Sequence, residues 1–170
     1  MAVLPDADPG AAFKEVFRFH PAAVAVITTI DADGPVGLTA SSVASVATDP
    51  PCLSFSVTRA RGSAGRLLRA SSVDVHLLRV HHVALARTFA IPGSTRFTDA
   101  EGWRYDADGS PLLPDARATL RCQLSTTVPV GSSTLVIAEV TDIILHPETD
   151  ALLYADRRFG QFDPDIASPG

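Results

Sequence analysis

The feature that most constrains the fold is a series of short runs in which apolar and polar residues alternate. In the run CLSFSV, Leu53, Phe55 and Val57 share one face, and the serines between them share the other. Successive side chains of a strand point to opposite faces of a sheet, so this alternation predicts a half-buried strand. About six strand-like runs occur along the chain, among them residues 23–30, 73–78, 118–130 and 133–146.

Helical spacing is confined to short segments. Residues 11–19 place Phe13, Val16 and Phe17 on one helical face, and residues 80–90 form a second candidate helix. Strands and long helices do not alternate, which disfavours a doubly wound parallel sheet. The expected fold class is therefore mainly β, a six-stranded antiparallel barrel with short flanking helices.

Length and composition indicate one globular domain. The chain has 170 residues, of which 46% are hydrophobic and 19% are charged, enough apolar surface for a sizeable core. We expect residues 1–12, rich in Pro, Asp and Gly, to be disordered, residues 13–163 to form the domain, and residues 164–170 to be a flexible tail.

Charge and hydropathy exclude several classes of partner. A net charge of −5 argues against nucleic-acid binding, which depends on Lys and Arg neutralising phosphates. No uncharged apolar run approaches the roughly 18 residues of a membrane helix, and no signal peptide is visible. We expect a cytoplasmic protein in which Cys52 and Cys122 are buried free thiols; a disulfide is the alternative.

Several common sites find no support in the sequence. No glycine-rich dinucleotide loop follows a strand, no P-loop is present, and no serine lies in a G-x-S-x-G elbow. His81 and His82 are the only adjacent histidines, and helical neighbours point about 100° apart. We therefore expect no metal site.

The segment GLTASSVASVATDPP carries more hydroxyl groups than a core strand would. Thr39, Ser41, Ser42 and Ser45 supply them, and Ala40 keeps the surface shallow. The segment is either a solvent-facing strand end or a cleft of backbone N–H groups and hydroxyls. A cleft of the second kind suits a planar, polar heterocycle.

These residues resemble the flavin reductase-like, FMN-binding split-barrel family. The likeness begins at FRFHPAAVAVITT, is most specific at GLTASSVASV…DPP, and continues through RLLRASSVDVHLL, LARTFA, LRCQL, TLVIAEV and LLYADRRFGQF. It covers roughly residues 13–162 in the family's order. The resemblance implies a split barrel that binds FMN or FAD and takes hydride from NADH or NADPH.

The resemblance also implies which residues contact the flavin. Thr39, Ala40, Ser41 and Ser42 would line the ring edge, with Ser45 nearby. The following strand would pass beneath the flavin with Ser54, Phe55, Ser56 and Val57. The loop TRARGSAGR would face the phosphate through Arg61 and Ser63, although a solvated basic loop is the alternative. His82 and either Arg157 or Arg158 are further candidates.

One departure from the family concerns the hydride donor. Many members have Gly-Asp-His before the TLVIAEV strand, where this chain has Gly131, Ser132 and Ser133. Ser133 and Phe159 would lie in the nicotinamide region, and no residue would be catalytic, since hydride passes between the cofactors.

The resemblance implies an NAD(P)H-dependent flavin reductase, a homodimer that supplies reduced flavin to a separate oxygenase. A flavin-binding carrier or sensor without efficient turnover is the alternative. The turn-rich segment 91–115, with Phe97, Trp103 and Tyr105, is the candidate subunit contact or substrate lid.

Overall fold

The structure is a computed structural model that describes residues 8–147 and 150–162. Its helices are α1 (Pro9–Arg18), α2 (Gly62–Leu67) and α3 (Val83–Ala90), with 3-10 turns η1 (Val80–His82) and η2 (Asp99–Glu101). Its strands are β1 (Ala22–Ala23), β2 (Ala25–Asp31), β3 (Gly34–Ala40), β4 (Ala44–Thr48), β5 (Pro51–Thr58), β6 (Ser72–Leu77), β7 (Arg104–Tyr105), β8 (Pro111–Leu112), β9 (Ala118–Val130), β10 (Ser133–Leu145), β11 (Leu152–Ala155) and β12 (Arg158–Gln161).

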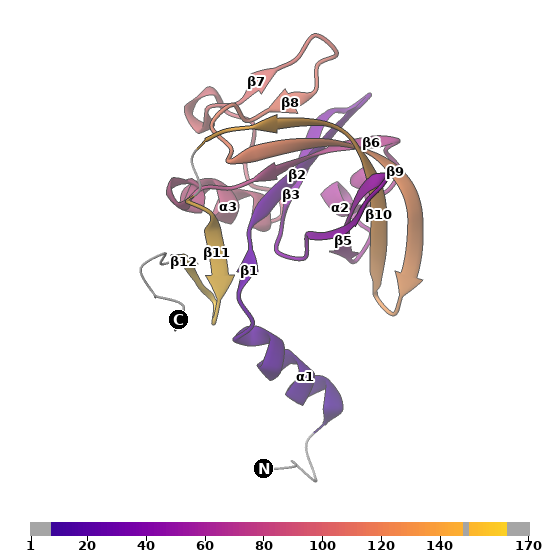
Figure 1. Cartoon of the computed structure of the whole chain (residues 1–170), viewed down its shortest axis with the longest axis vertical. Coiled ribbons are helices and arrows are strands. Elements are labelled where there is room, and N and C mark those ends of the chain that lie inside the picture. The colour runs from indigo at the N-terminus through magenta and orange to yellow at the C-terminus, as the bar shows by residue number, and fades with distance from the viewer. Residues whose placement is uncertain (1–7, 148–149, 163–170) are drawn as a thin grey trace.

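Seven strands form one strongly curved antiparallel sheet in the order β3-β2-β6-β9-β10-β5-β4 (Figure 1). The mainly β, antiparallel prediction is confirmed, but the main sheet has seven strands rather than six. Within the described residues, no ladder closes the sheet between its edge strands β3 and β4. The link between these two strands is instead fastened to β5, because the Ser42 hydroxyl bonds both the N–H and the carbonyl oxygen of Ser56.

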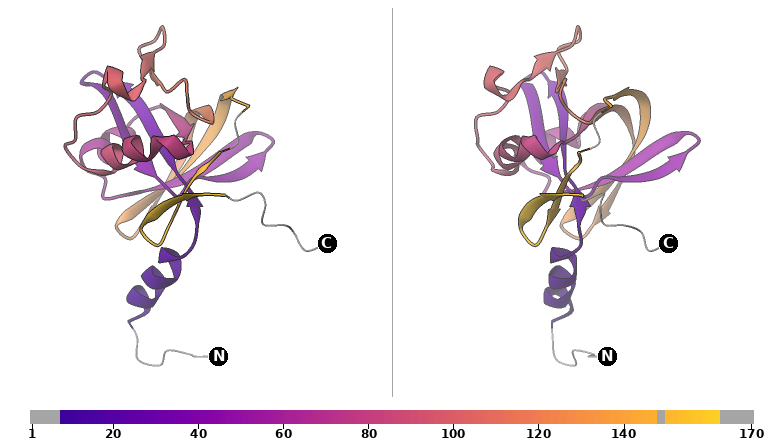
Figure 2. Two further views of the ribbon diagram at one scale, coloured as in Figure 1. Left: turned by 90° about the vertical axis from the view of Figure 1, so that its left-hand side faces the viewer. Right: turned by 60° about the vertical axis from the view of Figure 1, so that its left-hand side comes forward.

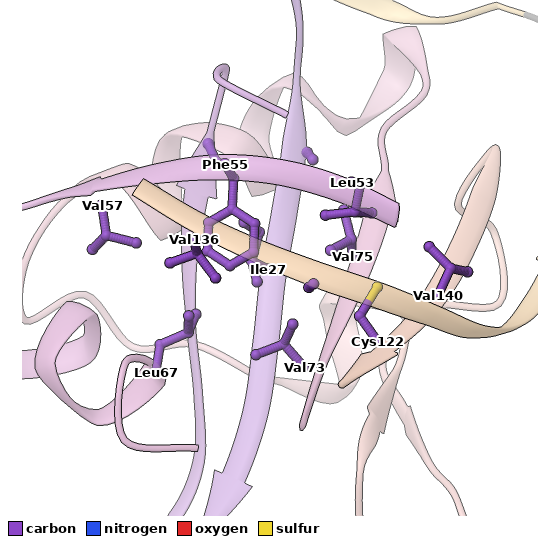
Figure 3. Close-up of a cluster of buried hydrophobic side chains, with 13 residues drawn as sticks. Ile27, Leu53, Phe55, Val57, Leu67, Val73, Val75, Cys122, Val136 and Val140 are labelled. Atoms are coloured by element: carbon purple, nitrogen blue, oxygen red, sulfur yellow. The ribbon is translucent and has the colours of Figure 1, made fainter. Parts of the chain in front are cut away.

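The concave face of the sheet encloses an apolar cluster. Figure 3 shows Phe55 pointing from β5 toward Val136 and Ile27, and all three side chains are fully buried. The alternation of β5 explains this placement, since Leu53, Phe55 and Val57 all belong to the cluster. Burial of these side chains supplies the main driving force for folding of this part of the chain.

The two cysteines are free thiols, as expected. Cys122 belongs to the inner cluster, and burial raises the pKa of its thiol to about 12. Cys52 is only half-buried, so the prediction that both thiols are buried holds for one of them.

A second cluster covers the opposite face of the sheet. Phe89 of α3, Phe97 and Trp103 contact one another with ring centroids 5.0–5.4 Å apart. Trp103 is 6% exposed, so this part of segment 91–115 packs on its own chain, contrary to the expected lid or subunit contact. Tyr105 is 51% exposed. Trp103 is buried because β2 contributes apolar residues to both faces of the sheet, and each face needs a covering layer.

Helix α1 projects from the body of the molecule in all three views (Figures 1 and 2). It begins at Pro9, so residues 9–12 are helical and not disordered as predicted. Asp8 explains the early start, because its side chain accepts a hydrogen bond from the N–H of Gly10 and proline suits the first helical position. The rest of the predicted N-terminal disorder and the C-terminal tail 164–170 lie outside the described residues.

The helices are short. Across residues 8–147 and 150–162, none combines the length and apolar content needed to cross a membrane.

Candidate functional site

Three clefts lie along β3 and along the link between β3 and β4. The first, the α3 cleft, has a volume of about 440 Å³ and lies between β3, α3 and the β11–β12 hairpin. Thr39 and Ser41 line it from one side, and Tyr154, Arg157 and Phe159 line it from the other. Its walls therefore combine hydroxyl groups, aromatic rings and two cations, since Arg87 of α3 also lines the cleft.

The second, the α1 cleft, has a volume of about 830 Å³ and lies between α1 and residues 41–44. It shares Ser41, Tyr154 and Arg157 with the α3 cleft, so the two clefts meet along this line. Ser42 and Ser56 also line it.

The third, the Arg96 cleft, has a volume of about 410 Å³ and lies over the other half of β3. Arg96 donates through Nη1 to the Gly37 carbonyl oxygen at 2.6 Å and to the Ser63 hydroxyl at 3.0 Å. Its Nη2 donates to the Ile91 carbonyl oxygen at 2.7 Å, while its buried Nε has no hydrogen-bond partner among the residues that the structure describes. Burial lowers the pKa of Arg96, yet an arginine remains cationic at neutral pH. The cleft thus presents a fixed positive charge beside a hydroxyl group.

The four hydroxyl residues of the segment after Leu38 have different surroundings in the structure. The Thr39 hydroxyl donates to the Ala86 carbonyl oxygen at 2.6 Å and so fastens α3 to β3. The Ser42 hydroxyl lies 2.9 Å from the Ser56 nitrogen and holds the link against β5. Ser41 is exposed at the junction of the α1 and α3 clefts. Ser45 is exposed in a different groove, lined by β4, β9 and β10.

Three of the predicted flavin contacts have side chains in the apolar core. Ala40, Phe55 and Val57 belong to the inner cluster and line none of the three clefts. Any contact between these residues and a ligand would therefore involve backbone atoms. Ser56 faces the α1 cleft, whereas half-buried Ser54 lines none of the three.

Of the two candidates predicted around the start of α2, Ser63 lines the Arg96 cleft and Arg61 does not. Arg61 is exposed and lies just before α2. The cations that line this cleft are Arg96 and Arg66, of which Arg66 is paired with Asp31. Sequence reasoning missed Arg96 because it lies in a turn-rich segment without periodicity; an isolated arginine beside glycine and serine was the available signal.

The remaining candidates are spread around the sheet. Phe159 lies under the guanidinium group of Arg87, 5.6 Å from its ring centroid. Arg157 lines two of the clefts, but exposed Arg158 lines none of the three. Half-buried Ser133 places its hydroxyl 3.3 Å from that of Thr58, also away from these clefts.

His82 is 8% exposed and belongs to a separate ion-pair network. The rings of His81 and His82 lie 4.1 Å apart and both face Asp115, so the expected divergence of the two rings is wrong. The cause is the tight 3-10 turn η1. Their three ligand-type atoms lie within 4.8 Å of one another.

The hydrogen bonds of this network oppose metal binding. The His82 Nδ1 accepts from the Arg79 backbone N–H at 3.1 Å, which leaves the neutral ring's proton on Nε2, the atom that faces Asp115. The Arg79 guanidinium binds the other Asp115 oxygen at 2.9 Å. Burial, together with the neighbouring His81, lowers the pKa of His82 to about 4.

Comparison with known proteins gives a consistent result. Residues 17–163 match the flavin reductase like domain. The NADH:FMN oxidoreductase of Rhodococcus qingshengii is 38% identical over 138 residues, which cover 81% of this chain and 71% of that protein. The solved NADH:FAD oxidoreductase of Streptomyces globisporus, in complex with NAD and FAD fragments, has a TM-score of 0.86 at 29% identity and covers 98% of this chain and 100% of that one. The styrene monooxygenase flavin reductase of Pseudomonas putida S12 has a TM-score of 0.78 at 25% identity, with 91% and 99% covered. The chain belongs to the flavin reductase like family.

Proposed function

We propose that this protein is an NADH-dependent flavin reductase whose flavin lies along β3. The observation that carries the proposal is the succession of two clefts along β3, a cationic cleft at Arg96 and a hydroxyl- and aromatic-lined cleft at Ser41, which share no lining residue but both border this strand. A flavin nucleotide has the same arrangement, with an anionic phosphate at one end and a planar polar ring at the other.

The residues present fit such a group. The buried Arg96 Nε without a partner and the Ser63 hydroxyl suit a phosphate, to which arginine makes charge-assisted bonds. Gly37 and Ser41 are four residues apart, or about 13 Å along a strand, which suits an extended polyol chain between phosphate and ring.

The bound flavin would supply the redox chemistry by accepting hydride from the nicotinamide ring. The protein's own contribution is to bind and orient the two partners. Thr39 holds α3 at the correct distance from β3, and Ser42 holds the link that presents Ser41. FMN and FAD both remain candidates, and NADH is the donor named for the relatives.

Ser41→Trp tests this location of the flavin. Its side chain makes no hydrogen bond within the described residues, so an indole there fills the junction of two clefts without breaking a support. We expect loss of FMN and FAD binding, measured by quenching of flavin fluorescence. Ser45→Trp is the matched control, because Ser45 is equally exposed but lies in another groove. Unchanged flavin affinity in folded Ser41→Trp would place the flavin elsewhere.

The second candidate is a flavin-binding protein without efficient turnover. Ser133 favours it, because the donor-associated histidine of many family members is replaced and the Ser133 hydroxyl faces Thr58. Oxidation of NADH at 340 nm with added FMN distinguishes the two functions. Tight flavin binding without NADH or NADPH oxidation would support the carrier function.

We also infer that the protein acts as a homodimer. Phe13, Val16 and Phe19 on or beside α1 are more than half exposed, and an apolar groove of about 560 Å³ lies beside β4. A second copy would cover this surface and complete a half-open sheet. A strict monomer at micromolar concentration that still binds flavin tightly would contradict this inference.

A separate oxygenase is the proposed recipient of reduced flavin, by analogy with the styrene monooxygenase reductase. We place both proteins in the cytoplasm, where NADH is available. Added to a flavin-dependent oxygenase that lacks a reductase, the protein should support substrate oxidation from NADH. Failure of transfer despite rapid flavin reduction would contradict this role.

A further inference from the structure

The α1 cleft is larger than the α3 cleft and has a different charge. Among the charged residues that line it, Lys14, Arg18 and Arg157 are cations and only Glu15 is an anion. This local excess of positive charge contrasts with the net charge of −5 for the whole chain. A cleft of this kind attracts an anionic ligand.

Two of these cations are available to a ligand. Arg18 is occupied, because it forms ion pairs with Glu15 at 3.3 Å and with Asp156 at 2.7 Å. In contrast, neither Lys14 nor Arg157 makes an ion pair or a side-chain hydrogen bond within residues 8–147 and 150–162. Both side chains are exposed to the cleft from opposite walls, one on α1 and one on the β11–β12 hairpin.

Arg157 is also held in an unusual backbone conformation. Asp156 and Arg157 form the two-residue turn between β11 and β12, with φ values of 47° and 59°. Positive φ at both positions favours glycine or asparagine, so an arginine at the second position is strained. The turn is fixed to α1, since the Asp156 N–H donates to the Arg18 carbonyl oxygen at 2.6 Å.

The α1 cleft also offers an aromatic surface. Phe17 is 55% exposed and lines the cleft, with its ring 5.8 Å from the ring of His20. Tyr154 lines the cleft at its junction with the α3 cleft. Aromatic faces of this kind stack on nucleobases without selecting among them.

We propose that the α1 cleft binds the adenosine diphosphate half of a dinucleotide whose redox-active half lies in the α3 cleft. Lys14 and Arg157 would contact the diphosphate, and Phe17 would stack on the adenine. This proposal rests on the proposed function, because it needs a redox ligand in the adjoining cleft. The dinucleotide is NADH, because the flavin's own phosphate is proposed to lie at Arg96, whereas the α1 cleft adjoins the ring end of the flavin site.

Arg157→Gly tests the proposal with little risk to folding, because glycine prefers the positive φ of this position. We expect about tenfold weaker binding of ADP-ribose to the FMN-loaded protein, measured by calorimetry, since one charge-assisted contact is lost. Lys14→Gln should weaken binding in the same direction, as an independent variant on the other wall. Arg158→Ala is the matched control. It removes the same charge from the neighbouring residue, and the Arg158 side chain lines neither the α1 cleft nor the α3 cleft.

Kinetics test whether the cleft binds NADH. Arg157→Gly should raise KM for NADH about tenfold, with kcat within about twofold. Its kcat/KM for 1-benzyl-1,4-dihydronicotinamide, which has no phosphate, should not change. Weaker binding of FAD than of FMN in the variant, with an unchanged KM for NADH, would contradict the proposal and assign the cleft to FAD.

Three further results would overturn the proposal. The first is unchanged binding of ADP-ribose and NADH in Arg157→Gly. The second is an equal loss in Arg157→Gly and Arg158→Ala, and the third is an equal loss for the phosphate-free donor. Measurements on the wild-type protein distinguish failure of the proposed function from failure of this proposal. ADP-ribose binding without flavin binding would contradict the proposed function alone, whereas NADH:flavin turnover without ADP-ribose binding would contradict this proposal alone.

Discussion

The two faces of the main sheet differ in what they bury. The inner cluster consists of apolar side chains and one thiol from alternating strand positions. The outer face buries His76, whose ring lies 3.0 Å from the hydroxyls of both Thr28 and Thr119, beneath Trp103. The three clefts also lie on the outer side, around α3 and the link after β3. The comparison indicates that the inner face mainly supplies stability, and it predicts that the outer face, which tolerates polar groups, supplies recognition.

The largest expected effect comes from truncating the inner cluster. Phe55→Ala should lower the free energy of unfolding by about 3–5 kcal/mol, because it leaves a cavity at a side chain with 0% exposure. Urea denaturation measures this loss, and Ser54→Ala on the opposite face is the control. The folded variant should bind FMN within about twofold of wild type. A larger fall in FMN affinity would contradict the proposed division between the two faces, since the inner face would then contribute to recognition.

Asp74 tests the polar character of the outer face through pH. Burial raises the pKa of its carboxyl to about 6, against 3.8 for an ordinary aspartate. The protonated form is therefore favoured on folding, and this stability is present below pH 3.8 and lost as pH rises through 6. Asp74→Asn should raise the free energy of unfolding by at most about 3 kcal/mol at pH 8 and by little at pH 3. Equal stabilisation at both pH values would contradict the assignment.

His76 provides a second test, because its contribution to stability changes with pH in the opposite direction to that of Asp74. Burial lowers the pKa of its ring to about 3 from 6.5, so its stability contribution is complete above pH 6.5 and lost as pH falls toward 3. In the wild-type protein the two effects partly cancel between pH 4 and 6. In Asp74→Asn, the loss of stability on acidification over this window should become steeper.

Arg96→Gln tests recognition at the outer face. A hydrogen bond to a charged group contributes about 1.5–3 kcal/mol, so the Kd for FMN should rise about 10- to 100-fold. Riboflavin, which lacks the phosphate, should bind as before, and this excludes a general disturbance of β3. Arg61→Gln is the control of equal charge. Equal weakening of FMN and riboflavin would show that Arg96 acts only by supporting the fold.

The smallest effect is expected at Ser133. If a histidine at this position orients the donor, Ser133→His should raise kcat/KM for NADH by about tenfold or less, with flavin affinity within about twofold. Stopped-flow reduction of bound flavin measures the change. Slower turnover in a folded, flavin-binding variant would indicate that the donor binds by another route.

The inner face was the more predictable of the two. Alternation placed Leu53, Phe55 and Val57 on one face of a strand, and the structure confirms it. A period of two reports which side of a strand is buried, but it says nothing about which element will cover the other side. For that reason the packing of Trp103 against its own chain did not follow from the sequence.

The clefts were predictable only in outline. The hydroxyl run predicted a site at the link after β3, and Ser41 lies there at the junction of two clefts, but the Thr39 and Ser42 hydroxyls bond to the protein's own backbone. A sequence shows the donors and acceptors that a segment offers, not the partners that satisfy them. Arg96 and Arg157 come from turns, where long side chains reach groups distant in sequence and leave no periodic signal.

The bond made by Arg96 has a consequence for the solubility of the chain. An open sheet has an edge strand whose free carbonyl groups can pair with a strand of another molecule, the first step of fibril growth. On β3, carbonyl groups point alternately toward β2 and toward the free edge, and Pro35 and Gly37 belong to the set that faces the free edge. Arg96 donates to the Gly37 carbonyl oxygen at 2.6 Å, and Pro35 has no N–H to offer. An incoming strand would find this acceptor occupied and a bulky cation in its path, so Arg96 opposes aggregation at the free edge of β3.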